Sequence, residues 1–411
     1  MYRGALVSLA LCVIVKAQFE GEPCIDNDLV GVCTAVDNCI SAREGIRNRI
    51  QPKLCSFDRE IAIVCCLDNV PTTTTAPVAT THKPVTTTPD DFEPPPEEYE
   101  IVGGKTDTCG PVDANLTSPR TGQLAWDKCL EYQEKLVYPC EDSVSLRFGA
   151  GKERKNKCHL SADSLIVGGK DADRNEFTHM VLLGFGEDPR KVKWDCAGSL
   201  ISEYFVLTAA HCVTSADSGN VTYASVGVLT RSEVAPDNTY KISERFRHPS
   251  FRRGVYNDIA LLRLEREVIL GEYRVPACLH VGDTVKDARA MATGWGLLEY
   301  KGNVSDILQK VTLKKYRSRI CKAIFPPHTL VSHNYDEKTQ LCFGGYNDTQ
   351  PGDTCNGDSG GPLMIKHKKI NCMYLILGVT SGGRGCAWRG KPGLYSRVSH
   401  YISWIESVVW R

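Results

Sequence analysis

The chain has 411 residues with 49 basic and 49 acidic side chains, so its formal net charge is zero at pH 7. No charge excess favours nucleic acid or an anionic membrane as a partner, and a hydrophobic content of 42% excludes whole-chain disorder and a collagen-like fibre. The length predicts two or three domains. The 19 cysteines favour an oxidising compartment, where thiols become disulfides.

The first residues have the pattern of a secretory signal peptide. Arg3 is followed by an apolar run over residues 5–15 and by an expected cleavage site before Gln18. That run is too short to cross a bilayer, which takes about 20 residues. We therefore predict a signal peptide at 1–17, whose removal takes away Cys12 and leaves an even number of cysteines. Four sequons are compatible with secretion: Asn115, Asn220, Asn303 and Asn347.

Six cysteines between Cys24 and Cys66 follow the pattern C-x8-C-x5-C-x15-C-x9-C-C. So short a segment cannot bury enough apolar surface to fold unaided, so we expect three disulfides, each contributing about 2–4 kcal/mol. Zinc is a weaker interpretation, because the segment has no C-x2-C pair and no histidine. We predict a small disulfide-stapled domain at 18–67.

Two connecting regions follow. Residues 68–99 are rich in Thr and Pro, which predicts an extended linker open to O-glycosylation. Residues 100–165 form a connecting pro-segment with four cysteines and a basic cluster at 152–157.

The remainder, 166–411, contains short apolar and β-branched runs, such as 226–229 and 259–264, separated by Gly, Pro and Asn. This pattern predicts a mainly β barrel fold. The end of this region predicts an amphipathic helix, whose apolar face holds Tyr401, Ile402, Ile405, Val408 and Val409.

Three motifs in this region carry candidate chemistry: TAAHC with His211, NDIALL with Asp258 and GDSGGP with Ser359. A lone His or Ser is most often structural, but these occur in the order His, Asp, Ser at matching spacing. A serine hydroxyl needs a base to take its proton, and a histidine base needs a carboxylate to fix its tautomer. The three motifs therefore predict nucleophilic acyl transfer.

On these motifs, 166–411 resembles the chymotrypsin-like serine proteases of the trypsin family over its whole length. The resemblance implies a two-barrel fold with a C-terminal helix and a triad of His211, Asp258 and Ser359. It also implies an oxyanion hole made by the N–H groups of Gly357 and Ser359, with Ser381 helping to orient Asp258.

The resemblance implies no cofactor. Calcium is not supported, because Val228 stands where calcium-binding relatives carry an acid.

The resemblance also extends to specificity. Asp353 lies six residues before Ser359, where the family places the floor of its primary pocket, and a carboxylate there prefers Arg or Lys side chains. A solvated loop acid is the alternative for Asp353. Gly383 and Gly393 match the pocket-wall glycines. Gly382 departs from the family's aromatic residue and removes a wall of the neighbouring subsite, so selectivity beyond the Arg/Lys position stays open.

Activation is expected to follow the family's zymogen mechanism. Cleavage after Leu165 would free the ammonium of Ile166 to pair with Asp358. A second IVGG at 101–104 lies 110 residues before His211, against 45 for Ile166, so we interpret it as a decoy or as the trace of a duplicated exon. A trypsin-like enzyme does not cut after leucine, so an upstream activating protease is expected.

The resemblance implies that Cys196–Cys212, Cys321–Cys342 and Cys355–Cys386 staple the barrels and that Cys158–Cys278 tethers the pro-segment. One further family pair is missing, since Ala290 and Ile365 occupy its positions. For the four remaining cysteines we expect Cys129–Cys372 and Cys109–Cys140.

The six-cysteine unit, with its adjacent final pair, looks like a clip domain. With the linker and the protease it resembles the arthropod clip-domain serine proteases, and Leu165 and the NCMY stretch at 371–374 resemble the snake-like subgroup. The resemblance implies the pairs Cys24–Cys65, Cys33–Cys55 and Cys39–Cys66. In that family the module docks cascade partners; the alternative is an inert spacer.

The expected function is a secreted zymogen of a trypsin-like serine endopeptidase in an extracellular cascade of a haemolymph-like fluid. By resemblance, such cascades serve Toll-ligand processing, melanisation or dorsoventral patterning. The expected partners are an upstream protease cutting after Leu165, a downstream protease zymogen cut after Arg or Lys, and a serpin-type inhibitor, with no nucleic acid and no membrane. One alternative is a non-catalytic clip-domain homologue acting as a cofactor, which would need a damaged triad. The other is a digestive trypsin, which would gain nothing from a clip unit.

Overall fold

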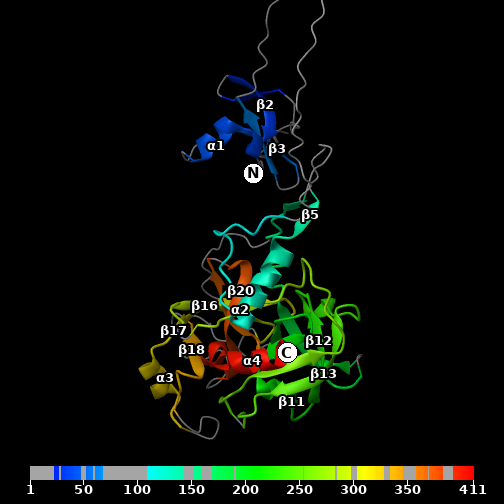
Figure 1. Cartoon of the computed structure of the whole chain (residues 1–411), viewed down its shortest axis with the longest axis vertical. Helices are drawn as coiled ribbons and strands as arrows, with labels where there is room; N and C mark the ends of the chain where they lie inside the picture. Colours follow the sequence, from blue (N-terminus) through cyan, green and yellow to red (C-terminus); the bar gives the residue numbers. More distant parts are fainter. Residues whose placement is uncertain are drawn as a thin grey trace, which may run out of the picture. The chain divides into compact units, whose positions relative to one another are not determined.

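The computed structural model describes residues 23–26, 29–47, 52–58, 61–67, 109–142, 152–158, 169–188, 191–252, 254–282, 285–297, 303–327, 334–345, 358–368, 370–382 and 392–411. The chain divides into two compact units, 1–98 and 99–411, which are described separately (Figure 1). In the described parts, no helix is long and apolar enough to span a membrane.

The N-terminal unit is a four-stranded antiparallel sheet with one helix. Its strands lie in the order β1-β2-β4-β3. They are β1 (Pro23–Asp26), β2 (Leu29–Ala35), β3 (Leu54–Asp58) and β4 (Ile61–Cys66), with the 3-10 turn η1 (Val36–Asn38) and the helix α1 (Ile40–Arg47) after β2.

Three disulfides hold this unit together, in the pairing that the clip resemblance implied: Cys24–Cys65, Cys33–Cys55 and Cys39–Cys66. Two small apolar clusters are built around these bridges. Because so few side chains are buried, the covalent links replace the large core that the segment cannot form.

The second unit begins with the connecting segment. It contains α2 (Leu124–Tyr132), a turn of π-helix η2 (Gln133–Val137), and the hairpin β5 (Cys140–Asp142) with β6 (Lys152–Arg154). The Glu406 carboxylate, from the C-terminal helix, accepts hydrogen bonds from the Ala125 amide (2.7 Å) and the Gln123 side chain (2.6 Å). It thereby satisfies a free N–H at the start of α2, where the helix dipole also favours an anion.

The first barrel is a closed six-stranded antiparallel sheet. Its order is β12-β13-β14-β10-β9-β8, closed by pairing of β8 with β12. The strands are β8 (Met180–Phe185), β9 (Lys193–Leu200), β10 (Phe205–Thr208), β12 (Gly219–Val226), β13 (Thr239–Arg247) and β14 (Ala260–Leu264), with β11 (Thr214–Ser215) added beside β12. Apolar and β-branched residues fill its interior, as the short apolar runs predicted.

The second barrel repeats this closure. Its order is β20-β19-β16-β17-β18-β21, closed by pairing of β20 with β21. The strands are β16 (Arg289–Gly294), β17 (Gln309–Lys315), β18 (Gln340–Gly344), β19 (Pro362–His367), β20 (Ile370–Gly382) and β21 (Gly393–Arg397). Two short strands join it, β7 (Lys170–Asp171) on β17 and β15 (Cys278–Leu279) on β20, and α3 (Ser318–Ile324) follows β17. Ala290 and Ile365 pack in one apolar cluster where the family carries a further disulfide.

The predicted C-terminal helix is α4 (Ile402–Val409), preceded by the 3-10 turn η6 (Val398–Tyr401). Tyr401, Ile402 and Ile405 are buried in the core cluster of the first barrel. The apolar face expected from the sequence is therefore the face that packs. The mainly β, two-barrel fold with a C-terminal helix is confirmed.

The disulfides of the connecting segment differ in part from the expected pairing. The predicted Cys158–Cys278 and Cys129–Cys372 bridges are wrong: Cys129 pairs with Cys278 and Cys158 pairs with Cys372. The reason is that α2 packs against β15, which places Cys129 beside Cys278, whereas η2 packs against β20, which carries Cys372. The segment that follows β6 returns to η2, where the Lys157 amide donates a hydrogen bond to the Val137 carbonyl. Cys158 is the next residue, so it lies near Cys372. The Cys109–Cys140 bridge has the expected partners.

Candidate active site

His211 lies in the 3-10 turn η4 (Ala210–Val213), directly after β10. Ala209 and Ala210 are fully buried, so the chain turns within the core and leaves only the His211 side chain partly exposed. The neighbouring Cys212 is bonded to Cys196 of β9, as expected. This bridge fixes the turn that carries His211 to the wall of the first barrel.

Asp258 is fully buried just before β14. Its carboxylate accepts hydrogen bonds from the His211 ring Nδ1 (2.7 Å), the His211 amide (2.9 Å) and the Ser381 hydroxyl (2.6 Å). The Ser396 hydroxyl donates to its backbone carbonyl at 2.7 Å. These donors offset the cost of burying a carboxylate, and they fix the imidazole through Nδ1, while Nε2 lies 3.7 Å from the Cys212 sulfur.

The same contacts set the protonation of His211. Burial lowers the pKa of the imidazole, but the Asp258 charge and its hydrogen bond raise it by more, so the net pKa lies above the ordinary value of 6.5. A histidine held in this way is a stronger base than one free in water.

Ser359 lies on the turn that enters β19. Its carbonyl accepts a hydrogen bond from the Ala197 amide at 2.8 Å. Ala197 follows Cys196 in β9, and Cys196 is bonded to Cys212, so the strand to which the Ser359 carbonyl is hydrogen-bonded is covalently linked to the turn that carries His211. The structure thus brings the Ser359 and His211 motifs to one junction between the barrels.

Gly360 explains part of the GDSGGP motif. Its φ is +79°, and a Cβ at this position would lie 2.1 Å from the Thr208 hydroxyl oxygen. Only glycine fits both the left-handed backbone and the close approach to β10.

The Asp358 carboxylate lies against two glycines of the second barrel, Gly294 and Gly296. Its carboxylate accepts the Gly296 amide at 2.8 Å, and a Cβ added to Gly294 would lie 2.0 Å from the same oxygen. The G-W-G stretch at 294–296 therefore provides the space in which this carboxylate lies beside the second barrel.

Several predicted site residues lie outside the described residues. They are Leu165, Ile166, Asp353, Gly357 and Gly383, together with the Cys355–Cys386 bridge. Gly393 begins β21 opposite Phe343, and the Cys321–Cys342 bridge is present. A Cβ at Gly382 would lie 3.2 Å from the Val255 side chain, so a larger residue here would require Val255 to shift.

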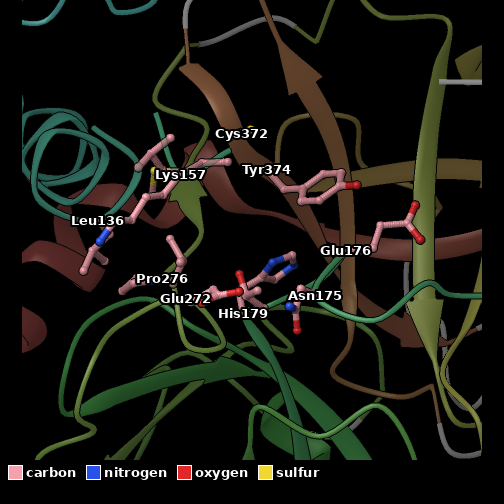
Figure 2. A pocket seen from close by; sticks show the side chains of 13 residues that line it. Leu136, Lys157, Asn175, Glu176, His179, Glu272, Pro276, Cys372 and Tyr374 are labelled. Atoms are coloured by element: carbon pink, nitrogen blue, oxygen red, sulfur yellow. The ribbon is translucent and has the colours of Figure 1, made fainter. Parts of the chain in front are cut away.

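A small cavity of about 30 Å³ lies where the connecting segment covers the second unit's barrels (Figure 2). His179 of β8's leading turn is fully buried there, and its Nε2 has no hydrogen-bond partner. Burial lowers the pKa of His179 to about 3, so the ring is neutral. Nothing in the sequence marks His179 as unusual, because a lone histidine carries no motif.

Two groups of metal-type ligands meet in the described residues: Cys24, Cys33 and Cys55, and Cys196, His211 and Cys212. Every cysteine in them is oxidised in a disulfide and offers no thiolate. The chemistry that the site offers is an oriented imidazole beside a serine turn, which suits proton transfer to and from a serine hydroxyl.

Comparison with known proteins agrees with this arrangement. Residues 166–405 match the family described as "Trypsin". The chain is 37% identical over 336 residues to Serine protease snk of Drosophila melanogaster, covering 76% of this chain and 73% of that protein. It is 33% identical to Phenoloxidase-activating factor 3 of Holotrichia diomphalia (64% and 78% covered) and 32% identical to CLIP domain-containing serine protease B14 of Anopheles gambiae (60% and 72% covered). With its disulfide-stapled N-terminal unit and two closed barrels, the chain belongs to the trypsin family, among the arthropod clip-domain serine proteases of the snake-like type.

Proposed function

We propose that the chain is the secreted zymogen of a trypsin-like serine endopeptidase whose triad is His211, Asp258 and Ser359. The observation that carries the proposal is the buried Asp258 carboxylate, which holds the His211 ring at 2.7 Å and the Ser381 hydroxyl at 2.6 Å. A histidine with only a structural role would not need a buried carboxylate that several hydrogen-bond donors hold in place.

The proposed reaction proceeds in two steps. His211 Nε2 takes the Ser359 proton as Oγ bonds to the substrate's carbonyl carbon, and the imidazolium then protonates the leaving amine as the C–N bond breaks. Water, deprotonated by His211, attacks the acyl-enzyme and releases the carboxylic acid, and the proton returns to Ser359. The N–H groups of Gly357 and Ser359 would stabilise the oxyanion in both steps.

The proposed specificity is for Arg or Lys. Asp353, with Gly383 and Gly393 as open walls, would form a long pocket that ends in a carboxylate. Its support is the position of Asp353 in the GDTCNGDSGGP stretch. A carboxylate out of bulk water binds a guanidinium or ammonium strongly and disfavours neutral side chains.

The proposed switch is cleavage after Leu165. The new Ile166 ammonium would pair with Asp358 in the space left by Gly294 and Gly296. That carboxylate is adjacent to Ser359, so the pairing would order the oxyanion hole and the pocket together.

The proposed setting is an extracellular protease cascade, with an upstream protease, a downstream zymogen and a serpin-type inhibitor as partners. The support is the name of one relative, Phenoloxidase-activating factor 3, together with the clip-type N-terminal unit of this chain. A signal peptide at 1–17 would bring the chain to a haemolymph-like fluid, where its disulfides persist.

Two variants test the triad and the pocket. After cleavage at Leu165, Ser359→Ala should reduce Arg-peptide amidase activity to below about 1% while the melting temperature stays unchanged. Asp353→Ser should lower the ratio of Arg to Leu peptide cleavage by at least about tenfold. Residual turnover in the first variant would remove Ser359 from the triad, and an unchanged ratio in the second would remove Asp353 from the pocket.

A further inference from the structure

A partly buried arginine joins the two barrels next to the proposed switch. Arg231 begins the 3-10 turn η5 (Arg231–Glu233) of the first barrel. Its guanidinium donates to three backbone carbonyls, those of Trp194 (2.7 Å), Trp295 (2.7 Å) and Ser305 (3.0 Å). Trp194 belongs to the first barrel, whereas Trp295 and Ser305 belong to the second. The planar fork of arginine suits such simultaneous donation, and lysine cannot reproduce it.

One of these hydrogen bonds leads directly to Asp358. The Trp295 carbonyl accepts from Arg231, and the amide of the same peptide group, on Gly296, donates to the Asp358 carboxylate at 2.8 Å. A single planar peptide group therefore joins a cation to an anion. Hydrogen bonds to charged groups are the stronger ones, and each end polarises the amide in favour of the other.

The turn that carries Arg231 is itself firmly held. Thr230 and Glu233 form a capping box around it, and the Leu229 carbonyl accepts the Trp295 indole N–H at 2.9 Å. The Ser305 amide also donates to the Gly296 carbonyl at 3.0 Å. Arg231 is therefore a fixed donor, and it bonds the second barrel at two positions, the carbonyls of Trp295 and Ser305.

Arg231 keeps its charge even though burial lowers its pKa overall, because the ordinary pKa of arginine lies far above neutral. Burial lowers its pKa, while the nearby carboxylates of Asp195, Asp358 and Asp306 favour the charged form. The charge on Arg231 thus acts on Asp358 both through space and through the shared peptide group.

We infer that Arg231 is a positioning residue, which holds the Trp295–Gly296 peptide group so that the Asp358 carboxylate is oriented to receive the Ile166 ammonium. The inference rests on the proposed function, in which that pairing orders the Ser359 region. Loss of Arg231 would remove the hydrogen bond that holds the Trp295 carbonyl, and the Gly296 amide would then be less firmly directed at Asp358.

Two substitutions and one control test this role. Arg231→Met removes the fork and the charge at similar length, and Arg231→Lys keeps the charge but not the three-way donation. Arg245→Met is the matched control. Arg245 is also a partly buried arginine of the first barrel, its pKa is likewise lowered by burial, and its Nε donates to one carbonyl, that of Val221, at 2.7 Å.

Each zymogen is cleaved with a Leu-specific protease, and four quantities are measured: the new N-terminal sequence, the reactivity of the Ile166 amine toward cyanate, and kcat and KM for an Arg peptide. In Arg231→Met we expect normal cleavage, a more reactive amine, and a loss of kcat/KM of about tenfold or more. KM should rise more than kcat falls, because substrate in the pocket favours the ordered state. Arg231→Lys should be intermediate, and Arg245→Met should match the wild type.

A merely structural role for Arg231 would change the melting temperature without changing amine reactivity or the KM-to-kcat balance. If Arg231→Met has a protected Ile166 amine and wild-type kcat/KM, the inference is overturned while the proposed function stands. If the cleaved wild type is itself inactive, the proposed function fails first. Should Arg231→Met not fold, Arg231→Lys decides by the same readouts.

Discussion

At the scale of single residues, Asp258 controls both the orientation and the basicity of His211. Its carboxylate meets the ring, the backbone amide of the same histidine and the Ser381 hydroxyl. The neighbouring Asn257 has a φ of +51° and is bonded to Tyr401 of the turn before α4. Asp258 is thus held by hydrogen bonds from both barrels, and the residue before it is held by the C-terminal segment.

This arrangement predicts the effect of Asp258→Asn. The variant loses the charge that raises the pKa of His211, while the burial that lowers it stays. Because His211 must be neutral to accept a proton, activity rises with pH through its pKa, so the acid limb of kcat/KM should move to lower pH. The rate at the plateau should fall by about 10³- to 10⁴-fold. A pH profile on cleaved enzyme measures both, and an unmoved acid limb would contradict the role of Asp258.

His179 predicts an acid sensitivity of a different kind. Its pKa of about 3 in the folded chain lies below the 6.5 of an exposed histidine, so the unfolded chain binds the extra proton between these values. Stability should therefore fall as pH drops from 6.5 toward 3, by about 2 kcal/mol at about pH 5. The His179→Phe variant should lose less stability on acidification, because phenylalanine does not titrate. The new ring would still have aromatic neighbours, Phe177 and Tyr374.

Urea unfolding of Ser359→Ala zymogens with and without His179→Phe measures this difference. The two should be similar at neutral pH and diverge as the solution is acidified. Parallel losses of stability on acidification would show that His179 is not the group responsible.

At the scale of elements, the connecting segment is bound to the protease unit by two disulfides and by the Glu406 contact at the start of α2. The pairing predicts that Cys158→Ser with Cys372→Ser leaves no free thiol and keeps the cleaved segment attached through Cys129 and Cys278. The pairing first expected from the sequence would instead leave two free thiols. Thiol titration and non-reducing electrophoresis after cleavage distinguish the two.

The sequence predicted the elements better than it predicted their contacts. Apolar runs predicted strands such as β14, and the apolar face at 401–409 predicted α4, because burial of one face is a local pattern. The partner of Cys129 depends on α2 packing against β15, about 150 residues later, and no local pattern encodes that contact. Arg231 was missed for the same reason, since its carbonyl partners have no side-chain signature.

At the scale of the whole molecule, the protease unit places its serine turn, its histidine turn and the Asp358 contact at the junction of two closed barrels. One buried cluster joins Leu182 and Ala197 of the first barrel to Trp295 and Met364 of the second, so the two barrels pack directly on each other at this junction. A switch located there can change the site without unfolding either barrel. The N-terminal unit is a separate fold with its own disulfides, which suits a module that acts on partners.

The most direct test of the central claim is to cleave the purified zymogen with a Leu-specific protease, then read the new N-terminus and assay Arg-peptide amidase activity on the same sample. The proposal predicts an Ile166 terminus together with new activity, and no activity in Ser359→Ala cleaved in parallel. An Ile166 terminus without activity in the wild type would contradict it and would favour either a homologue that acts as a cofactor or a further partner that orders the site.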